Sequence, residues 1–396
     1  MFVRTATNRV ESRRPFNSPQ SDMDRDELVA LLALSLSDGL GAKRVLLLRD
    51  YFSSALLAMS ASANKLEQIP GIGRSTALQA IASRNSAMQH AERIINSLQS
   101  DIGVVTYYDV AYPEELRAIF TPPPILFTRG NIELLSAPRR LAIIGTRRAT
   151  DYGKSCVKML CTEFVNEGVV ITSGFAQGID TTAHQSCFQS GGSTIAVFGC
   201  GVDVIYPSSN AAFARELASS ERGLLISEFL PGAKPDARNF PWRNRIVSGL
   251  SHGVLVVESE LRGGSMLTAS LALDQNRDIF AIPGDINRPL SSGPNSLISD
   301  SRAKLAISGR QIMEDLGWVN SDRKQLNGSK GVDRSGLTLF ESQLVEVLEA
   351  AGGPLHIDTV SERSMREVQD ILVTLLQMEL KGVVRQMAGK QFTLFF

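Results

Sequence analysis

Two glycine-containing turns combine the residue types that bind phosphate groups. Gly145-Thr146-Arg147 follows the apolar run Leu141–Ile144, and Ser173–Gly178 follows the β-branched run Val169–Thr172. Each run is long enough for one buried strand, and each turn precedes apolar residues at helical spacing. Backbone N–H groups at the start of a helix favour an anion, and Arg147 adds a positive charge beside them. These residues therefore suit phosphate binding.

A third stretch, RNFPWRNR at residues 238–245, places aromatic rings among arginines. Arginine forks suit phosphate oxygens, and rings such as those of Phe240 and Trp242 suit unstacked bases along a charged groove. Packing of the two rings within a loop is the alternative, and the sequence leaves both interpretations open.

The motifs of several enzyme classes are missing from this chain. The first turn reads GTRRATDYG and lacks the dinucleotide spacing GxGxxG, and neither GxxxxGK[ST] nor GxSxG occurs. Asp180 and His184 are four residues apart without a nucleophile beside them, which favours a capping aspartate and a packed histidine. We therefore expect no catalytic residues and no cofactor.

Composition narrows the class of protein further. The four cysteines show no CxxC spacing and the four histidines are scattered, so we expect buried free thiols and no metal site. No apolar run approaches the length of a membrane span, and the N-terminus lacks the apolar core of a secretory signal, which predicts a cytoplasmic protein without membrane contact. With 41 basic and 41 acidic residues, only local clusters of charge can support a nucleic-acid partner.

Short apolar runs alternate with helical patterns over about 200 residues, which predicts an α/β fold with a doubly wound, Rossmann-like parallel or mixed sheet. Further strands are expected at Gly103–Tyr107, Ile125–Phe127, Thr194–Phe198, Leu224–Ser227, Gly253–Val257 and Asp278–Ile282. Leu290–Asp300 is rich in serine and glycine, and we expect a long loop there. The sheet domain is predicted to span residues 101–318.

Residues 1–24 are polar and arginine-containing, and we expect a disordered arm. Residues 25–100 are predicted to form an all-helical domain, similar to SAM and helix–hairpin–helix domains. Within it, Ile69-Pro70-Gly71-Ile72-Gly73-Arg74 resembles the helix–hairpin–helix turn, whose amides bind a DNA phosphate. A plain turn between helices is the alternative.

Residues 319–336 are polar without an apolar period, which is typical of a linker. Residues 337–396 predict three short helices and a small hairpin, the pattern of a winged-helix domain. Such domains often bind duplex DNA. However, Ser364–Glu379 carries three carboxylates against Arg366 alone, so a protein-contact module is an equal interpretation.

Six ordered motifs between Leu141 and Ile298 resemble the DNA-processing protein A (DprA, also called Smf) family: IIGTRRATDYG, VITSGFAQGIDTTAH, AVFGCGVDVIYPSSN, FPWRNRIVSGLS, VVESELRGGSMLTASLAL and AIPGDINRPLSSGPNSLI. The resemblance implies a non-catalytic, Rossmann-like core that binds single-stranded DNA, forms a homodimer and loads the RecA recombinase during natural transformation. The helical and winged-helix-like regions also resemble those of the longer members.

The resemblance also implies which residues meet the DNA. The expected set is Arg147, the amides near Gly174 and Gly178, and Arg243, Asn244 and Arg245, with Phe240 and Ser265 as weaker members. The chain departs from the family at Asp300-Ser301-Arg302-Ala303, where the family usually has a Gly-Ala pair.

Two other functions compete with this interpretation. A nucleotide phosphoribohydrolase of the lysine-decarboxylase-like family has a similar sheet and the motif PGGxGTxxE. The nearest stretch here, Arg262–Thr268, is followed by no carboxylate before Asp274. A structural adaptor that acts only through its terminal domains is the other alternative.

Overall fold

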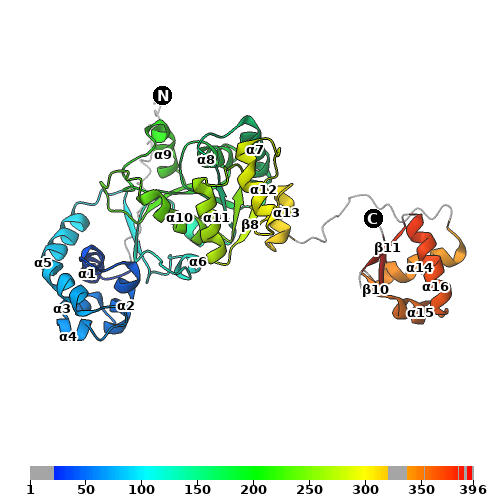
Figure 1. Cartoon of the computed structure of the whole chain (residues 1–396), viewed down its shortest axis with the longest axis horizontal. Coiled ribbons are helices and arrows are strands. Elements are labelled where there is room, and N and C mark those ends of the chain that lie inside the picture. Colours follow the sequence, from blue (N-terminus) through cyan, green and yellow to red (C-terminus); the bar gives the residue numbers. More distant parts are fainter. Residues whose placement is uncertain (1–21, 320–336, 352, 382, 388–389, 395–396) are drawn as a thin grey trace, which may run out of the picture. The chain divides into compact units, whose positions relative to one another are not determined.

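The computed structural model describes residues 22–319, 337–351, 353–381, 383–387 and 390–394. The chain divides into two compact units, Met1–Asn320 and Ser321–Phe396 (Figure 1). Most of the predicted arm at residues 1–24 and nearly all of the predicted linker at 319–336 lie outside the described residues. No helix in the described ranges combines the length and apolar character that crossing a bilayer requires.

A nine-stranded sheet forms the centre of the first unit, in the order β1-β2-β6-β5-β4-β3-β7-β8-β9. The strands from β6 to β9 in this order are parallel, whereas β2 pairs antiparallel with both β1 and β6. The predicted α/β, doubly wound sheet is therefore confirmed. The strands are β1 Gly103–Thr106, β2 Ile125–Gly130, β3 Arg140–Ile144, β4 Val170–Ser173, β5 Thr194–Val197, β6 Gly223–Ser227, β7 Gly253–Val256, β8 Asp278–Ala281 and β9 Lys304–Leu305.

Helices cover both faces of this sheet (Figure 1). In β3, Leu141 and Ile143 pack in one apolar cluster with helices α7, α8 and α13, while Ala142 and Ile144 pack in another with α10, α11 and α12. Successive side chains of a strand point to opposite faces, so a strand between two helical layers must be apolar throughout. The helices are α6 Glu114–Arg117, α7 Asp151–Asn166, α8 Ile179–Gln189, α9 Ala211–Ala218, α10 Asn239–Gly249, α11 Gly264–Asp274, α12 Ser292–Ser299 and α13 Gly309–Asp315.

Helix α12 lies where the sequence predicts a loop, so that prediction is wrong. Pro294 lies in the first turn of the helix, where a missing N–H costs no hydrogen bond. Leu297 is fully buried and anchors the helix in the core despite its Ser/Gly-rich composition. In the turn that departs from the family pattern, Ser301 adopts a left-handed conformation with φ 56°.

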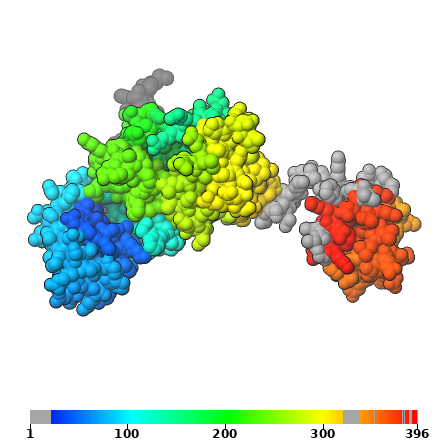
Figure 2. Space-filling view, viewed as in Figure 1, coloured from blue at the N-terminus to red at the C-terminus, as the bar shows by residue number. Residues whose placement is uncertain are grey.

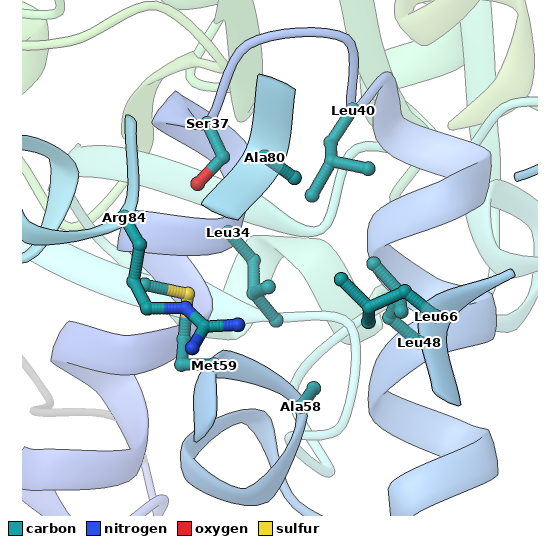
Figure 3. Close-up of a pocket in the computed structure, with 9 residues that line it drawn as sticks. All are labelled: Leu34, Ser37, Leu40, Leu48, Ala58, Met59, Leu66, Ala80 and Arg84. Atoms are coloured by element: carbon teal, nitrogen blue, oxygen red, sulfur yellow. The ribbon is translucent and has the colours of Figure 1, made fainter. Parts of the chain in front are cut away.

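The predicted N-terminal helical region is confirmed as five helices: α1 Arg25–Leu36, α2 Ala42–Phe52, α3 Ala55–Ser60, α4 Ala63–Leu66 and α5 Arg74–Asn96. Residues from all five helices surround a cavity of ≈ 10 Å³, among them Leu34 of α1, Leu48 of α2 and Arg84 of α5 (Figure 3). The predicted hairpin turn joins α4 to α5, with Ile69 and Ile72 buried and Gly71 at φ +84°.

The helical region and the sheet share one apolar core, which contains Leu48 of α2 and Phe127 of β2. In addition, the Tyr108 hydroxyl donates a hydrogen bond to Asp50 at 2.8 Å, and the Arg49 guanidinium lies 3.8 Å from the centre of the Tyr108 ring. Accordingly, the blue helices adjoin the cyan and green surface of the sheet region without a gap (Figure 2).

The described residues of the second unit form three helices and a three-stranded antiparallel sheet in the order β10-β12-β11, which confirms the predicted winged-helix pattern. Its core contains Leu344, Val360, Leu375 and Phe392. The elements are α14 Leu339–Ala351, β10 Leu355–His356, α15 Ile357–Ser364, α16 Val368–Leu380, β11 Val384–Met387 and β12 Gln391–Leu394.

A cluster of charged and polar side chains connects α6 to the amino-terminal ends of β3 and β7. Glu115 of α6 forms an ion pair with the buried Arg140, which begins β3, and lies 3.1 Å from Nε2 of His252, which precedes β7. The hydrogen bond from His252 and the charge of Arg140 lower the pKa of Glu115 to about 2. The ionised carboxylate therefore stabilises the folded chain.

Glu115→Gln removes this charge at nearly constant size. Because the pKa of Glu115 is lower in the folded than in the unfolded chain, its contribution is present above pH 4.5 and is lost as the pH falls towards 2. We expect the variant to lose about 2 kcal/mol of unfolding free energy at pH 7, and its difference from wild type to shrink by about 1 kcal/mol at pH 3.5. Urea unfolding at both pH values measures this, and a difference that does not change with pH contradicts it.

Candidate nucleic-acid interface

Three of the predicted site residues, Arg147, Gly174 and Gly178, lie in turns that follow neighbouring parallel strands, and the others lie on helices α10 and α11. The turns after β3, β4, β5 and β7 come out at the same edge of the sheet, because carboxyl ends of parallel strands share one edge. The strand order reverses between β3 and β7, and ligands of open α/β sheets bind outside such an edge.

Backbone contacts hold the first two turns together. The N–H of Ile179, at the start of α8, donates to the carbonyl oxygen of Thr146 at 3.1 Å. Gly178 adopts φ +81°, and a Cβ there would collide with the carbonyl groups of Thr146 and Arg147. Glycine is therefore required at 178 both for its backbone angle and for this close approach.

Glu258, the second residue after β7, holds the other side of the turn that follows β3. The N–H of Thr146 donates to the Glu258 carbonyl at 2.7 Å, and the buried Glu258 carboxylate accepts from both the N–H and the hydroxyl of Thr150. The Glu258 carboxylate thus occupies the space between the ends of β3 and β7, where the strand order reverses. Its negative charge would repel an anion there, so an anion would bind more favourably at the turns after β3 and β4.

Arg147 points to solvent beside exposed aromatic rings. Its guanidinium lies 5.6 Å from the centre of the Phe240 ring, and the Phe240 ring lies 5.5 Å from that of Tyr206. Phe240 covers Gly199 after β5, where a Cβ would approach the ring to 2.8 Å. Neither Arg147 nor Arg148 has a carboxylate partner in the described part of the chain. One cation and two rings therefore form a row over the edge.

Arg243 lies beneath this row and is 4% exposed. Its Nη1 donates to the carbonyl oxygen of Gly174, at 2.5 Å, and to that of Val197, so that it joins the ends of β4 and β5. Burial lowers the pKa of Arg243 to about 10, and Arg147 is near enough to contribute to that shift. Arg147 and Arg243 therefore lie on the same side of the sheet edge, one exposed and the other buried.

Asp180 supplies a negative charge close to the buried guanidinium of Arg243. Burial raises its pKa to about 6, and the charge of Arg243 opposes that rise. It accepts a hydrogen bond from the N–H of Ala176 at 3.3 Å, so one amide expected to face phosphate is directed at Asp180. Gly178, rather than Asp180, caps α8, which corrects the predicted capping role. His184 is packed as predicted, with Nδ1 2.6 Å from the Thr194 hydroxyl.

Arg245 has a different environment from Arg243. It forms a bidentate ion pair with Glu228, at 2.5 and 2.6 Å, donates to the Thr121 carbonyl at 3.0 Å and lies against the Trp242 ring. Only 5% of it is exposed. This geometry gives Arg245 a structural ion pair in place of the phosphate contact expected from the sequence.

The remaining predicted residues lie around this centre. Gly174 packs against the Arg243 guanidinium, and Asn244 accepts from Arg243 Nε at 3.3 Å. Ser265 is buried in the first turn of α11, where its hydroxyl donates to Ser259 at 2.8 Å, so it offers little surface to a ligand. Tyr206 is absent from the residues expected from the sequence, and its only signal there is an aromatic residue in the polar turn after β5.

Three backbone amides in the turns after β3 and β4 make no hydrogen bond within the described part of the chain. The N–H groups of Arg147, Gln177 and Gly178 have no hydrogen-bond acceptor among the described residues. Exposed amides in adjoining turns form a concavity that attracts anions. In the described ranges, no three His, Cys, Asp or Glu side chains are grouped to hold a metal ion.

The fold defines a Rossmann-like protein that carries arginine and aromatic side chains at the carboxyl edge of its sheet and has an additional winged-helix unit. The family model for DNA recombination-mediator protein A matches residues 103–317, and the one for the DprA winged helix domain matches residues 335–390. The chain belongs to the DNA recombination-mediator protein A (DprA/Smf) family, which confirms the resemblance.

Known relatives cover most of the chain. Protein Smf of Escherichia coli (strain K12) is 38% identical over 70% of this chain and 74% of its own length. Protein Smf of Synechocystis is 30% identical over 93% of this chain and 99% of its own. The X-ray structure of DNA processing protein A from Streptococcus pneumoniae has a TM-score of 0.63 and 32% identity, and covers 74% of this chain and 98% of that one.

Gly178→Ala tests the contact between the two turns. Gly191 has a similar φ of +89° but open space around it, so Gly191→Ala isolates the cost of the backbone angle. We expect about 1 kcal/mol of destabilisation for Gly191→Ala and about 3 kcal/mol or more for Gly178→Ala. Urea unfolding of both variants measures the difference, and equal losses would show that the turns do not depend on this contact.

Proposed function

We propose that the edge formed by the β3 and β4 turns and the start of α10 binds single-stranded DNA. The observation that carries this proposal is the row of Arg147, Phe240 and Tyr206, together with the N–H groups of Gln177 and Gly178, which have no acceptor among the described residues. The guanidinium and the amides suit phosphate oxygens, and the rings suit base faces.

The aromatic rings favour an unpaired strand over a duplex. Bases in a duplex are stacked on each other and do not offer their faces to a protein, whereas those of a single strand do. Tyr206 is 45% exposed, and Phe240 beside it is half-buried. In this proposal Arg243 and Asp180 hold the turns in place from below, and Arg147 makes the phosphate contact.

The family supports a wider proposal. We infer that this chain delivers the bound strand to the RecA recombinase, as a homodimer and without catalysing a reaction, during natural transformation in the cytoplasm. The family's description as a recombination mediator supports delivery. Within the proposal, residues 101–318 bind DNA, and residues 25–100 and 337–396, which precede and follow them in the sequence, are accessory domains.

Arg147→Ala tests the DNA contact, with Arg139→Ala as its control. Arg139 precedes β3 and bonds the Glu167 carbonyl at 2.8 Å, whereas Arg147 follows the strand at its other end. We expect Arg147→Ala to weaken binding of a labelled single strand about tenfold and to flatten the slope of log K against log salt by about 0.7, the value for one phosphate contact. Arg139→Ala should change neither.

Fluorescence anisotropy at several salt concentrations provides both quantities, and a duplex of the same sequence is titrated in parallel. Equal losses for the two variants, or tighter binding of the duplex, would remove this assignment of the site.

Delivery requires a separate measurement. We expect the wild-type chain to shorten the lag before RecA hydrolyses ATP on a strand covered by single-strand-binding protein, and Arg147→Ala to lengthen that lag severalfold at the same concentration. If the chain binds the strand but leaves the lag unchanged, the binding proposal stands and the delivery proposal fails.

A further inference from the structure

Helix α16 of the winged-helix unit has an exposed apolar face. Leu372, Val373 and Leu376 are 39%, 60% and 57% exposed. With Gln386 of β11 and Phe392 of β12 they line a groove of ≈ 200 Å³. The core of the unit is formed by other residues of this helix, including Ile371 and Leu375, so the exposed face is not needed for folding.

The charge of this unit opposes a DNA contact. α16 contains no lysine or arginine between Val368 and Leu380, while Asp370 lies exposed in its first turn. Residues 337–396 carry eight Asp and Glu against five Lys and Arg. Two of those cations are engaged within the unit, since Lys381 pairs with Glu341 at 2.7 Å and Arg366 lies over the Phe340 ring. Binding of duplex DNA requires cations at phosphates, and this helix offers none.

The acidic residues of this unit also indicate which kind of protein could bind the groove. A second copy of the face would bring Asp370 and Glu379 close to their equivalents, which like-charge repulsion disfavours. A helix with apolar residues at spacings of three and four fits an apolar groove, and lysines or arginines on its flanks would complement the acidic surface. We propose that the α16 face docks a basic amphipathic helix of a partner protein.

A defined peptide probes this surface on the full-length chain. The probe is a fluorescein-labelled, 14-residue peptide of leucine and lysine, with the leucines on one helical face, and its counterpart has every lysine replaced by glutamate. We expect saturable one-to-one binding of the lysine peptide by fluorescence anisotropy. Binding of the glutamate peptide should be at least about tenfold weaker because both surfaces are then acidic.

Leu376→Ser and Val373→Ser remove apolar area from the groove, and Leu339→Ser is the matched control. Leu339 is 95% exposed at the start of α14, away from the groove lining. We expect each groove variant to bind the lysine peptide about tenfold more weakly and Leu339→Ser to bind it like wild type.

Asp370→Asn tests the charge, and it should weaken binding of the lysine peptide without weakening binding of the glutamate peptide. Single-stranded DNA binding, which the proposed site in the other unit governs, should be unchanged in all four variants.

Several results would overturn the proposal. These are no saturable binding of the lysine peptide to wild type, equal binding of the two peptides, or wild-type affinity in both groove variants. Duplex DNA binding that is lost in Leu376→Ser would assign the face to DNA. Self-association by sedimentation that is lost in the same variant would assign it to a second copy. Thermal unfolding of each variant ensures that a loss is not caused by unfolding.

Discussion

The architecture of the candidate site depends on one buried guanidinium. A charge removed from water must be matched by hydrogen bonds and an opposite charge, or the fold is destabilised. Arg243 meets this requirement with the carbonyl groups of Gly174 and Val197 and with the nearby carboxylate of Asp180. Because those partners belong to the ends of β4 and β5 and to α8, the guanidinium fixes the turns whose outer surface carries Arg147 and the exposed amides.

The arginines of one short motif therefore have different physical tasks. Arg243 and Arg245 are two residues apart on α10, which places them on different sides of the helix. One points into the carboxyl edge of the sheet, and the other points to Glu228 and Trp242. Arg147, from a turn about 100 residues earlier, faces solvent beside the ring of Phe240. A run of arginines in a sequence is thus not a run of ligand contacts.

The sequence predicts the strands of the sheet well because a buried strand can be recognised from a few adjacent residues. Four or five apolar residues bounded by glycine are sufficient to indicate a buried parallel strand, as at Leu141–Ile144. It fails at α12, where the burial of Leu297 by distant residues outweighs a composition typical of loops. It also fails to separate buried from exposed arginines, and it does not show that Asp180 takes the Ala176 amide, because both depend on contacts between distant segments.

The zero net charge of the chain is consistent with a phosphate-binding edge once the acids near it are assigned partners. Asp180 lies with Arg243, Glu228 with Arg245, and Glu258 accepts from Thr150, and all three carboxylates are turned away from the surface. What remains at the surface is Arg147 without an acidic partner among the described residues, next to two rings. The potential at this edge is therefore set by which charges are paired internally, and the composition of the chain is a poor guide to it.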